Sequence, residues 1–181
     1  MGIESIPVST AMTRNVITET QNQNLQAVCK LMNENNIGSV IIVKDSIANI
    51  GKKANSNNNN KEAVGIITER DVVRLMGLLQ PHMLSIPVRD LMSKPIITLS
   101  PNNSIKDAIR TMQLNNIRRI LIMERGRIEG ITTSKDVFKA IINTRTLIPD
   151  LFSVSGQPQM EQRTLFDQFS DYWFSDVLPK R

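Results

Sequence analysis

Two threonine–aspartate pairs with identical spacing are the residues of this sequence best suited to hold a polar ligand. Thr68 lies three residues before Asp71 in the segment GIITERD, and Thr133 lies three residues before Asp136 in GITTSKD. At a helix start this spacing predicts a capping box, in which threonine caps the helix and the acid reaches back to the N–H of the cap. The position also suits a ligand, because a helix N-terminus favours phosphate and a carboxylate can accept hydrogen bonds from a ribose diol. The residues alone leave both interpretations open.

Two adjacent arginines are a second candidate site. Arg118 and Arg119 begin an apolar run that is expected to form a buried strand, whereas Gly38 and Ser39 stand at the equivalent place earlier in the chain. Charged groups at such a place must be paired or solvated. The arginines therefore either point outward toward surface acids or clamp the oxygens of a phosphate.

These candidates recur because the chain contains a tandem duplication. Residues 8–43 align with residues 88–123 at a constant offset of 80, and GIITERD aligns with GITTSKD at an offset of 65. The first copy therefore carries 15 additional residues. A duplicated unit that cannot close its own core usually closes it against its twin, so we expect paired pockets related by pseudo-two-fold symmetry.

Each copy is predicted to fold as β-α-β-β-α, with helix caps at Asn24 and Ser104. The expected strands cover residues 16–18, 39–43 and 63–67 in the first copy and residues 96–98, 119–123 and 127–131 in the second. A tight hairpin should join the last two strands of the second copy, whereas an Asn-rich insertion at about residues 45–62 should form a surface loop in the first. The predicted class is α+β, with repeat 1 over residues 1–80, repeat 2 over residues 81–146 and a C-terminal extension over residues 147–181.

Apolar patterns predict which faces are buried. The helix after each Thr-x-x-Asp segment carries a stripe suited to the core: Val72, Leu75, Met76 and Leu79 in the first copy, and Val137, Ala140 and Ile141 in the second. The runs 40–43 and 120–123 are apolar throughout, which predicts strands buried on both faces.

Composition narrows the class of protein. Residues 1–146 carry a net charge of +7 and residues 147–181 carry −2, but the basic residues are scattered among acids, so nucleic-acid binding is not expected. No apolar run approaches the roughly 18 residues of a membrane span. With Cys29 and His82 as the only residues of their types, neither a disulfide framework nor a catalytic or metal-binding cluster is expected. We expect a cytoplasmic protein without enzymatic activity.

The C-terminal extension differs from the rest of the chain. All seven aromatic residues lie after residue 137, and five residues of the extension fall at helical spacing: Leu165, Phe166, Phe169, Tyr172 and Trp173. This pattern predicts an amphipathic helix with an aromatic face. The face either packs on the repeated body or on another copy of the chain, or it is a docking surface for an effector protein.

Residue order and spacing over roughly residues 5–145 resemble a tandem pair of CBS domains, the motif named for cystathionine β-synthase. The GIITERD and GITTSKD segments carry the resemblance, together with Asn-Asn-Ile before an apolar strand in both copies. The resemblance implies that the two repeats pack together and bind adenosyl compounds (AMP, ADP, ATP or S-adenosylmethionine) at up to two sites. It also implies a homodimer formed through the repeated body.

The resemblance further implies which residues would bind, since each site combines the Thr-x-x-Asp segment of one copy with strand residues of the other. One site would comprise Thr68, Asp71, Ile97, Arg118 and Arg119. The other would comprise Thr133, Asp136, Ile17, Gly38 and Ser39. We therefore expect a phosphorylated nucleotide at the Asp71 site and a less anionic adenosyl ligand, or none, at the Asp136 site. The alternative is an interaction module with vestigial pockets that works through its aromatic extension.

Overall fold

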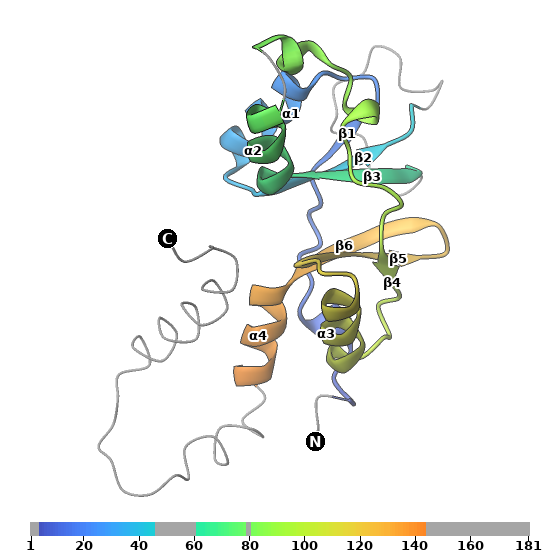
Figure 1. Ribbon diagram of the computed structural model, residues 1–181. Coiled ribbons are helices and arrows are strands. Elements are labelled where there is room, and N and C mark those ends of the chain that lie inside the picture. The colour runs from blue at the N-terminus through green and yellow to red at the C-terminus, as the bar shows by residue number, and fades with distance from the viewer. Residues whose placement is uncertain (1–3, 46–60, 79–80, 144–181) are drawn as a thin grey trace, which may run out of the picture. The chain divides into compact units, whose positions relative to one another are not determined.

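The computed structural model describes residues 4–45, 61–78 and 81–143, and these contain the element order predicted for each copy (Figure 1). Repeat 1 contains β1 (Thr18–Thr20), α1 (Leu25–Asn35), β2 (Ser39–Val43), β3 (Ala63–Thr68) and α2 (Glu69–Leu78). Repeat 2 contains β4 (Thr98–Leu99), α3 (Ile105–Leu114), β5 (Arg119–Glu124), β6 (Arg127–Thr133) and α4 (Ser134–Asn143). Short 3-10 helices cover η1 (Val8–Thr10), η4 (Pro81–Ser85) and η5 (Val88–Asp90). The α+β class is confirmed.

Both sheets have the same topology. The strand orders are β1-β2-β3 and β4-β5-β6, with the first pair of strands parallel and the second pair antiparallel. In the antiparallel pairs Ser39 lies opposite Thr68, and Arg119 lies opposite Thr133. The start of each central strand therefore adjoins the motif threonine of its own sheet.

The first strand of each repeat begins two residues later than the predicted strands at 16–18 and 96–98. Val16 and Ile96 instead pack in a hydrophobic cluster that contains residues of both repeats. The carbonyls of Ile17 and Ile97, directly before the strands, still accept hydrogen bonds from the central strands, at 3.2 and 3.3 Å. At the start of each predicted strand the side chains therefore pack between the two sheets, and regular pairing with the central strand begins two residues later.

The helix ends follow from local side-chain chemistry. The Asn24 side chain accepts a hydrogen bond from the Ala27 N–H at the start of α1, and Ser104 forms a capping box with Asp107 at the start of α3. After α1 and α3, Asn36 and Asn116 each adopt a left-handed φ of 51°, which asparagine tolerates better than most residues. Both predicted caps are confirmed.

The predicted hairpin of repeat 2 is a two-residue turn. Arg125 and Gly126 have φ values of 49° and 77°, and Glu124 pairs with Arg127 across them. Such a turn matches the right-handed twist of the flanking strands. Residues 46–60 of the loop predicted at about residues 45–62 lie outside the described residues, as does the aromatic helix predicted for the extension over residues 147–181.

Three hydrophobic clusters form the core. One packs α1 and α2 on the sheet of repeat 1, one packs α3 and α4 on the sheet of repeat 2, and the third joins the two sheets. The cluster between the sheets is centred on five buried residues: Val16, Ile41, Val43, Leu121 and Ile128. Residues 40–43 are all buried, as predicted for a strand covered on both faces.

One predicted core residue lies on the surface. Val72 and Leu75 of α2 pack on the core of repeat 1, but Met76 is 67% exposed. At about 100° per residue, Met76 lies on the same side of the helix as Val72, at the edge of the face that packs on the core, and its side chain projects beyond that contact. The stripe of α4 packs as predicted, with Val137 buried and Ala140 and Ile141 partly buried.

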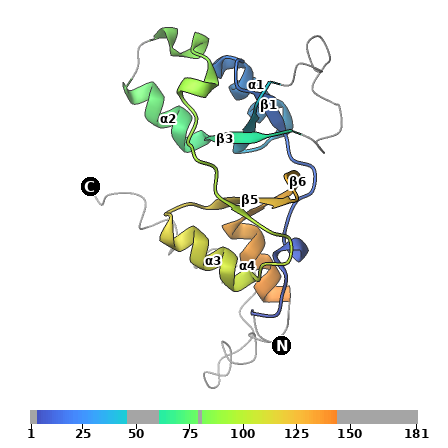
Figure 2. The same cartoon turned by 90° about the vertical axis from the view of Figure 1, so that its right-hand side faces the viewer.

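Each repeat is covered by the segment that precedes the other repeat. The N-terminal lead segment, residues 5–13, donates from the Val8 N–H to the Asn103 carbonyl at 2.7 Å and exchanges two backbone hydrogen bonds between Thr13 and Ile131. The central lead segment, residues 85–93, exchanges two such bonds between Ser93 and Ile66 of repeat 1. Figure 2 shows the N-terminal segment running along repeat 2 before the chain enters repeat 1. The predicted boundary at residue 80 follows the sequence repeat, whereas the packing exchanges the two lead segments.

Candidate functional site

The Thr68–Asp71 pair caps helix α2. Asp71 Oδ2 accepts hydrogen bonds from the Thr68 N–H at 2.9 Å and from the Thr68 hydroxyl at 2.7 Å. The Asp71 N–H in turn donates to Thr68 Oγ1 at 3.3 Å. The capping interpretation is therefore confirmed for this pair, and it uses one of the two carboxylate oxygens.

The Thr133–Asp136 pair caps α4 in the same way. Asp136 Oδ2 accepts from the Thr133 N–H at 3.0 Å and from its hydroxyl at 2.6 Å, and the Asp136 N–H donates to Thr133 Oγ1 at 3.3 Å. A carboxylate has two oxygens and the cap uses only Oδ2, so Asp136 Oδ1 remains able to accept a hydrogen bond from a ligand.

The second oxygen of Asp71 meets a residue that the sequence reasoning missed. The Ser93 hydroxyl donates to Asp71 Oδ1 at 3.3 Å, and Arg74 Nη2 lies 3.7 Å from the same oxygen. Ser93 belongs to the central lead segment and aligns with Thr13 of the N-terminal one. A hydroxyl at this aligned position in both copies was the signal that could have identified it.

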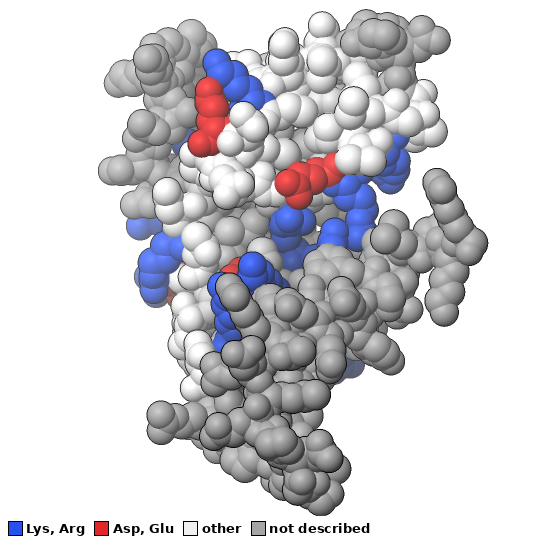
Figure 3. All heavy atoms as spheres, turned by 90° about the vertical axis from the view of Figure 1, so that its left-hand side faces the viewer, with Lys and Arg blue, Asp and Glu red and all other residues white. Residues whose placement is uncertain are grey.

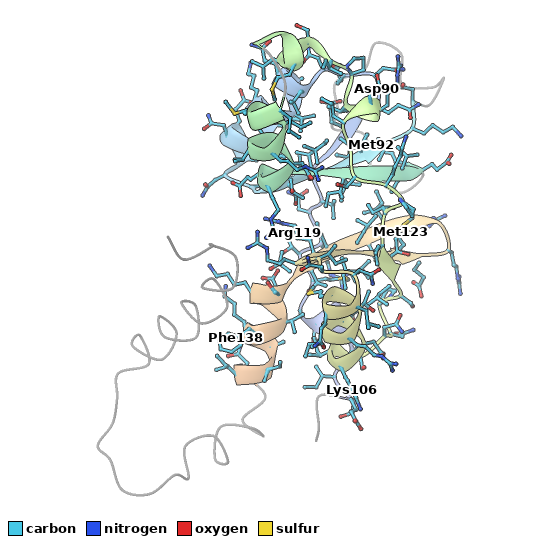
Figure 4. All side chains as sticks on the ribbon, in the orientation of Figure 1. Asp90, Met92, Lys106, Arg119, Met123 and Phe138 are labelled. Atoms are coloured by element: carbon cyan, nitrogen blue, oxygen red, sulfur yellow. The ribbon has the colours of Figure 1, made fainter. Side chains whose placement is uncertain are left out.

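Arg119 extends from repeat 2 to repeat 1. A Cβ atom at position 38 would lie 2.6 Å from Arg119 Nη2 and 2.6 Å from Glu69 Oε2, so the guanidinium and the carboxylate meet above the bare backbone of Gly38. Figure 4 shows Arg119 between the two repeats. None of the ion pairs within 4.0 Å among the described residues includes Arg119.

Arg118 and Arg70 complete what we call the arginine cluster, which comprises Arg70, Arg118 and Arg119. Burial lowers the pKa of Arg119, and it lowers the pKa of Arg118 as well. The guanidinium of Arg70 lowers both pKa values further, whereas the Glu69 carboxylate raises both. The cluster thus brings three like charges together beside two carboxylates, since Asp71 as well as Glu69 raises the pKa of Arg119. One positive charge is left in excess, which favours an additional anion. Basic side chains gather in the same way at the middle of the face shown in Figure 3, next to acidic ones.

The remaining predicted site residues are placed as follows. Ser39 lies opposite Thr68 in the sheet of repeat 1, and Ile17 and Ile97 lie half-buried directly before β1 and β4. The side chains nearest to Gly38 are those of Arg119 and Glu69, although the resemblance implied that Gly38 belongs to the site of Asp136. Arg119 is the residue that brings side chains of both repeats together at the Asp71 end.

A recess of about 390 Å³ adjoins this region on the helical side of repeat 1. Its walls are partly apolar and partly polar and come from α1, from the turn between α1 and β2, and from α2: Cys29, Met32, Asn33, Asn36, Ile37, Gly38, Glu69, Val72 and Val73. The recess meets the arginine cluster at Gly38 and Glu69. Burial raises the pKa of the half-buried Cys29 thiol, so the thiol is protonated at neutral pH.

Residues 4–45, 61–78 and 81–143 contain no group of three or more His, Cys, Asp and Glu side chains placed to hold a metal ion. No helix in these described ranges has the length and apolar character needed to cross a bilayer.

The fold and the motifs define a pair of CBS domains. The CBS domain family model matches residues 5–78 and again residues 88–143. The chain belongs to the CBS domain family and contains two tandem copies of the domain. The resemblance of the sequence to a tandem pair of CBS domains is thereby confirmed.

Three curated relatives illustrate the similarity. An uncharacterized protein of Methanopyrus kandleri is 30% identical over 76% of this chain and 63% of its own length, and one of Methanocaldococcus jannaschii is 30% identical over 75% and 42%. The CBS domain-containing protein YhcV of Bacillus subtilis is 28% identical over 72% of this chain and 81% of its own length. The chain therefore spans less than two thirds of the length of the two archaeal relatives.

Solved structures share the fold. An uncharacterized conserved protein from Pyrococcus horikoshii aligns with a TM-score of 0.61 and 25% identity, covering 88% of this chain and 100% of that one. A CBS domain protein from Pyrobaculum aerophilum complexed with AMP aligns with a TM-score of 0.59 and 18% identity over 76% and 99%. The CBS domain of a bacterial CNNM/CorC family Mg²⁺ transporter in complex with ATP aligns with a TM-score of 0.61 and 17% identity over 77% and 89%.

Proposed function

We propose that the tandem repeats form a cytoplasmic regulatory module that binds an adenosyl nucleotide (AMP, ADP, ATP or S-adenosylmethionine) beside Asp71. The observation that carries the proposal is the extension of Arg119 across the repeat boundary to Gly38 and Glu69. Phosphate oxygens would bind the arginine cluster, and ribose hydroxyls would donate to Asp71 Oδ1. Two proteins of the same fold solved with AMP and with ATP support this choice of ligand.

The role is regulatory and not catalytic. Proteins with CBS domains are generally regulatory, and here the ligand would contact side chains of both repeats. A ligand that binds one relative arrangement of the repeats more tightly shifts the population toward that arrangement. At the Asp136 end the position equivalent to Glu69 is Ser134, and Gly38 and Ser39 stand in place of the two arginines. This second site would therefore take a less anionic adenosyl ligand, or none.

A thermal-shift screen tests the proposal. A ligand at 100 times its dissociation constant stabilises the folded state by about 2.7 kcal/mol, which for a chain of this size raises the melting temperature by roughly 5–10 °C. We expect such a rise with at least one of the four adenosyl ligands. The Asp71→Ala variant should lose the rise for phosphorylated ligands.

The control is Asp107→Ala. Asp107 caps α3 with the geometry that Asp71 has at α2, since its Oδ2 accepts from the Ser104 N–H and hydroxyl at 2.9 Å each. Both variants should lower the melting temperature without ligand, because loss of a cap costs about 1 kcal/mol. Only Asp71→Ala should abolish the ligand response. If no adenosyl compound stabilises the chain, the alternative applies, namely an interaction module that acts through its aromatic extension.

We further propose that the chain forms a homodimer through α1 and α2. On α2 three apolar side chains are strongly exposed, Val73 at 69%, Met76 at 67% and Leu78 at 74%. Val73 also lines the recess described above. A two-fold contact requires one self-complementary surface, and a recess beside protruding apolar side chains meets that requirement. The charges of the helices favour the same surface. Helices α1 and α2 together carry three basic and three acidic residues and so have no net charge to repel a second copy, whereas α3 and α4 carry four basic and two acidic residues.

Sedimentation or light scattering tests the dimer. The wild-type chain should have the mass of two copies, and Met76→Glu should give a monomer because it would bury two unpaired carboxylates at the contact. The control is Leu114→Glu, since Leu114 on α3 is exposed to 74% and this variant introduces the same charge. A monomeric wild type, or a dimer that persists in Met76→Glu, would rule out this contact.

A further inference from the structure

Glu69 lies beside the arginine cluster, to which the phosphate of the proposed ligand would bind. Its Oε2 atom and Arg119 Nη2 each lie 2.6 Å from the point where a Cβ of residue 38 would stand, so they face one another across Gly38. The carboxylate acts electrostatically on Arg118 as well as on Arg119. Glu69 is thus a counter-charge shared by both partly buried guanidiniums, whereas Asp71 acts on Arg119 and not on Arg118.

The helix start does not require an acid here. The Glu69 N–H donates to the Gly38 carbonyl at 3.2 Å, and in repeat 2 the Ser134 N–H donates to the Arg118 carbonyl at 3.0 Å. Serine and glutamate therefore begin equivalent helices with the same backbone hydrogen bond. An acid at a helix N-terminus also interacts favourably with the helix dipole, but that effect does not depend on contact with Arg119.

We propose that Glu69 is a specificity-determining residue that acts as an internal competitor, holding the arginine cluster until a phosphate displaces it. A weakly charged anion gains little by replacing a carboxylate that is already present. A phosphate with two or more negative charges and several acceptor oxygens can bind more than one guanidinium at once. Glu69 would therefore suppress binding of weak anions and reserve the cluster for phosphorylated ligands. The nucleotide part of this inference rests on the proposed function.

The test compares wild type with Glu69→Gln by isothermal titration calorimetry, with inorganic tripolyphosphate, AMP and adenosine as separate probes. Glutamine keeps the size of the side chain and removes its charge. We expect Glu69→Gln to bind tripolyphosphate and AMP about three- to tenfold more tightly, as removal of one partly screened repulsion predicts. Adenosine binding should not change.

Glu34→Gln is the matched control, because it makes the same charge change on α1, where Glu34 pairs with Lys30 at 3.7 Å. It should leave all three affinities unchanged. Unchanged or weaker tripolyphosphate binding in Glu69→Gln would overturn the inference. If tripolyphosphate binds more tightly but neither AMP nor adenosine binds to either protein, the role of Glu69 stands and the nucleotide proposal fails.

Discussion

Replacement of Arg118 and Arg119 by alanine is expected to weaken AMP and ATP binding by about tenfold to a hundredfold and adenosine binding by less than about threefold. A hydrogen bond to a charged group contributes about 1.5–3 kcal/mol, and about 1.4 kcal/mol corresponds to a tenfold change in affinity. Folding should survive, because burial already disfavours both charges and alanine removes that cost. Isothermal titration calorimetry with the three ligands measures the selectivity directly.

A variant with the same change in net charge provides the control. Arg110 and Arg127 are exposed residues of α3 and β6, and Arg110→Ala with Arg127→Ala removes two positive charges outside the arginine cluster. This double variant should keep nucleotide affinity within about threefold of wild type, since exposed charges are screened at physiological salt. Equal loss of all three ligands in the Arg118 and Arg119 variant would refute the phosphate clamp.

Gly65→Ala and Gly130→Ala are expected to destabilise the fold by about 1–3 kcal/mol each, as overpacking of a tight contact does. At Gly65 a Cβ would lie 2.5 Å from Met92 Sδ and 3.0 Å from the Ser93 carbonyl oxygen. At Gly130 it would lie 2.8 Å from Met12 Sδ and 2.9 Å from the Thr13 carbonyl oxygen. A methionine side chain can move aside, but both carbonyls are held by backbone hydrogen bonds to the strand. The melting temperature should fall by about 2–4 °C for each kcal/mol of destabilisation.

Gly77→Ala is the internal control for these variants. Gly77 lies in α2, and a Cβ there would have no neighbour within 4 Å. Alanine in a helix is about 1 kcal/mol more favourable than glycine, so this variant should match or exceed the wild-type melting temperature. Identical melting temperatures for all three variants would show that the lead segments do not press on Gly65 and Gly130.

The parts of the fold that follow from local chemistry could be predicted from the sequence. Asn24, Ser104 and the Thr-x-x-Asp pairs mark helix starts because each side chain satisfies a backbone N–H close to it in sequence. The order of elements followed because two copies in register showed the same pattern twice. The tight hairpin followed because its two turn residues, Arg125 and Gly126, lie next to each other in the chain.

The features that escaped prediction depend on contacts between distant parts of the chain. The first strands begin late because Val16 and Ile96 pack between the sheets, and no local signal marks that preference. Met76 fits the apolar stripe of α2 equally well in sequence, yet it faces outward. The meeting of Glu69 with Arg119 joins residues that are 50 positions apart and lie in different repeats. Arg118 and Arg119 could be singled out from sequence only because the duplication exposed their mismatch with Gly38 and Ser39.

The exchange of lead segments means that neither repeat is a self-sufficient piece of protein. Residues 5–13 travel with repeat 1 in the chain but complete the surface of repeat 2, and residues 85–93 do the reverse. A cut between residues 78 and 81 would therefore yield two fragments, each of which packs its own lead segment on the repeat of the other. A polypeptide with one repeat alone would reach the same arrangement by exchanging lead segments with a second copy, as in a domain-swapped dimer. The tandem chain is the covalently linked form of such a dimer.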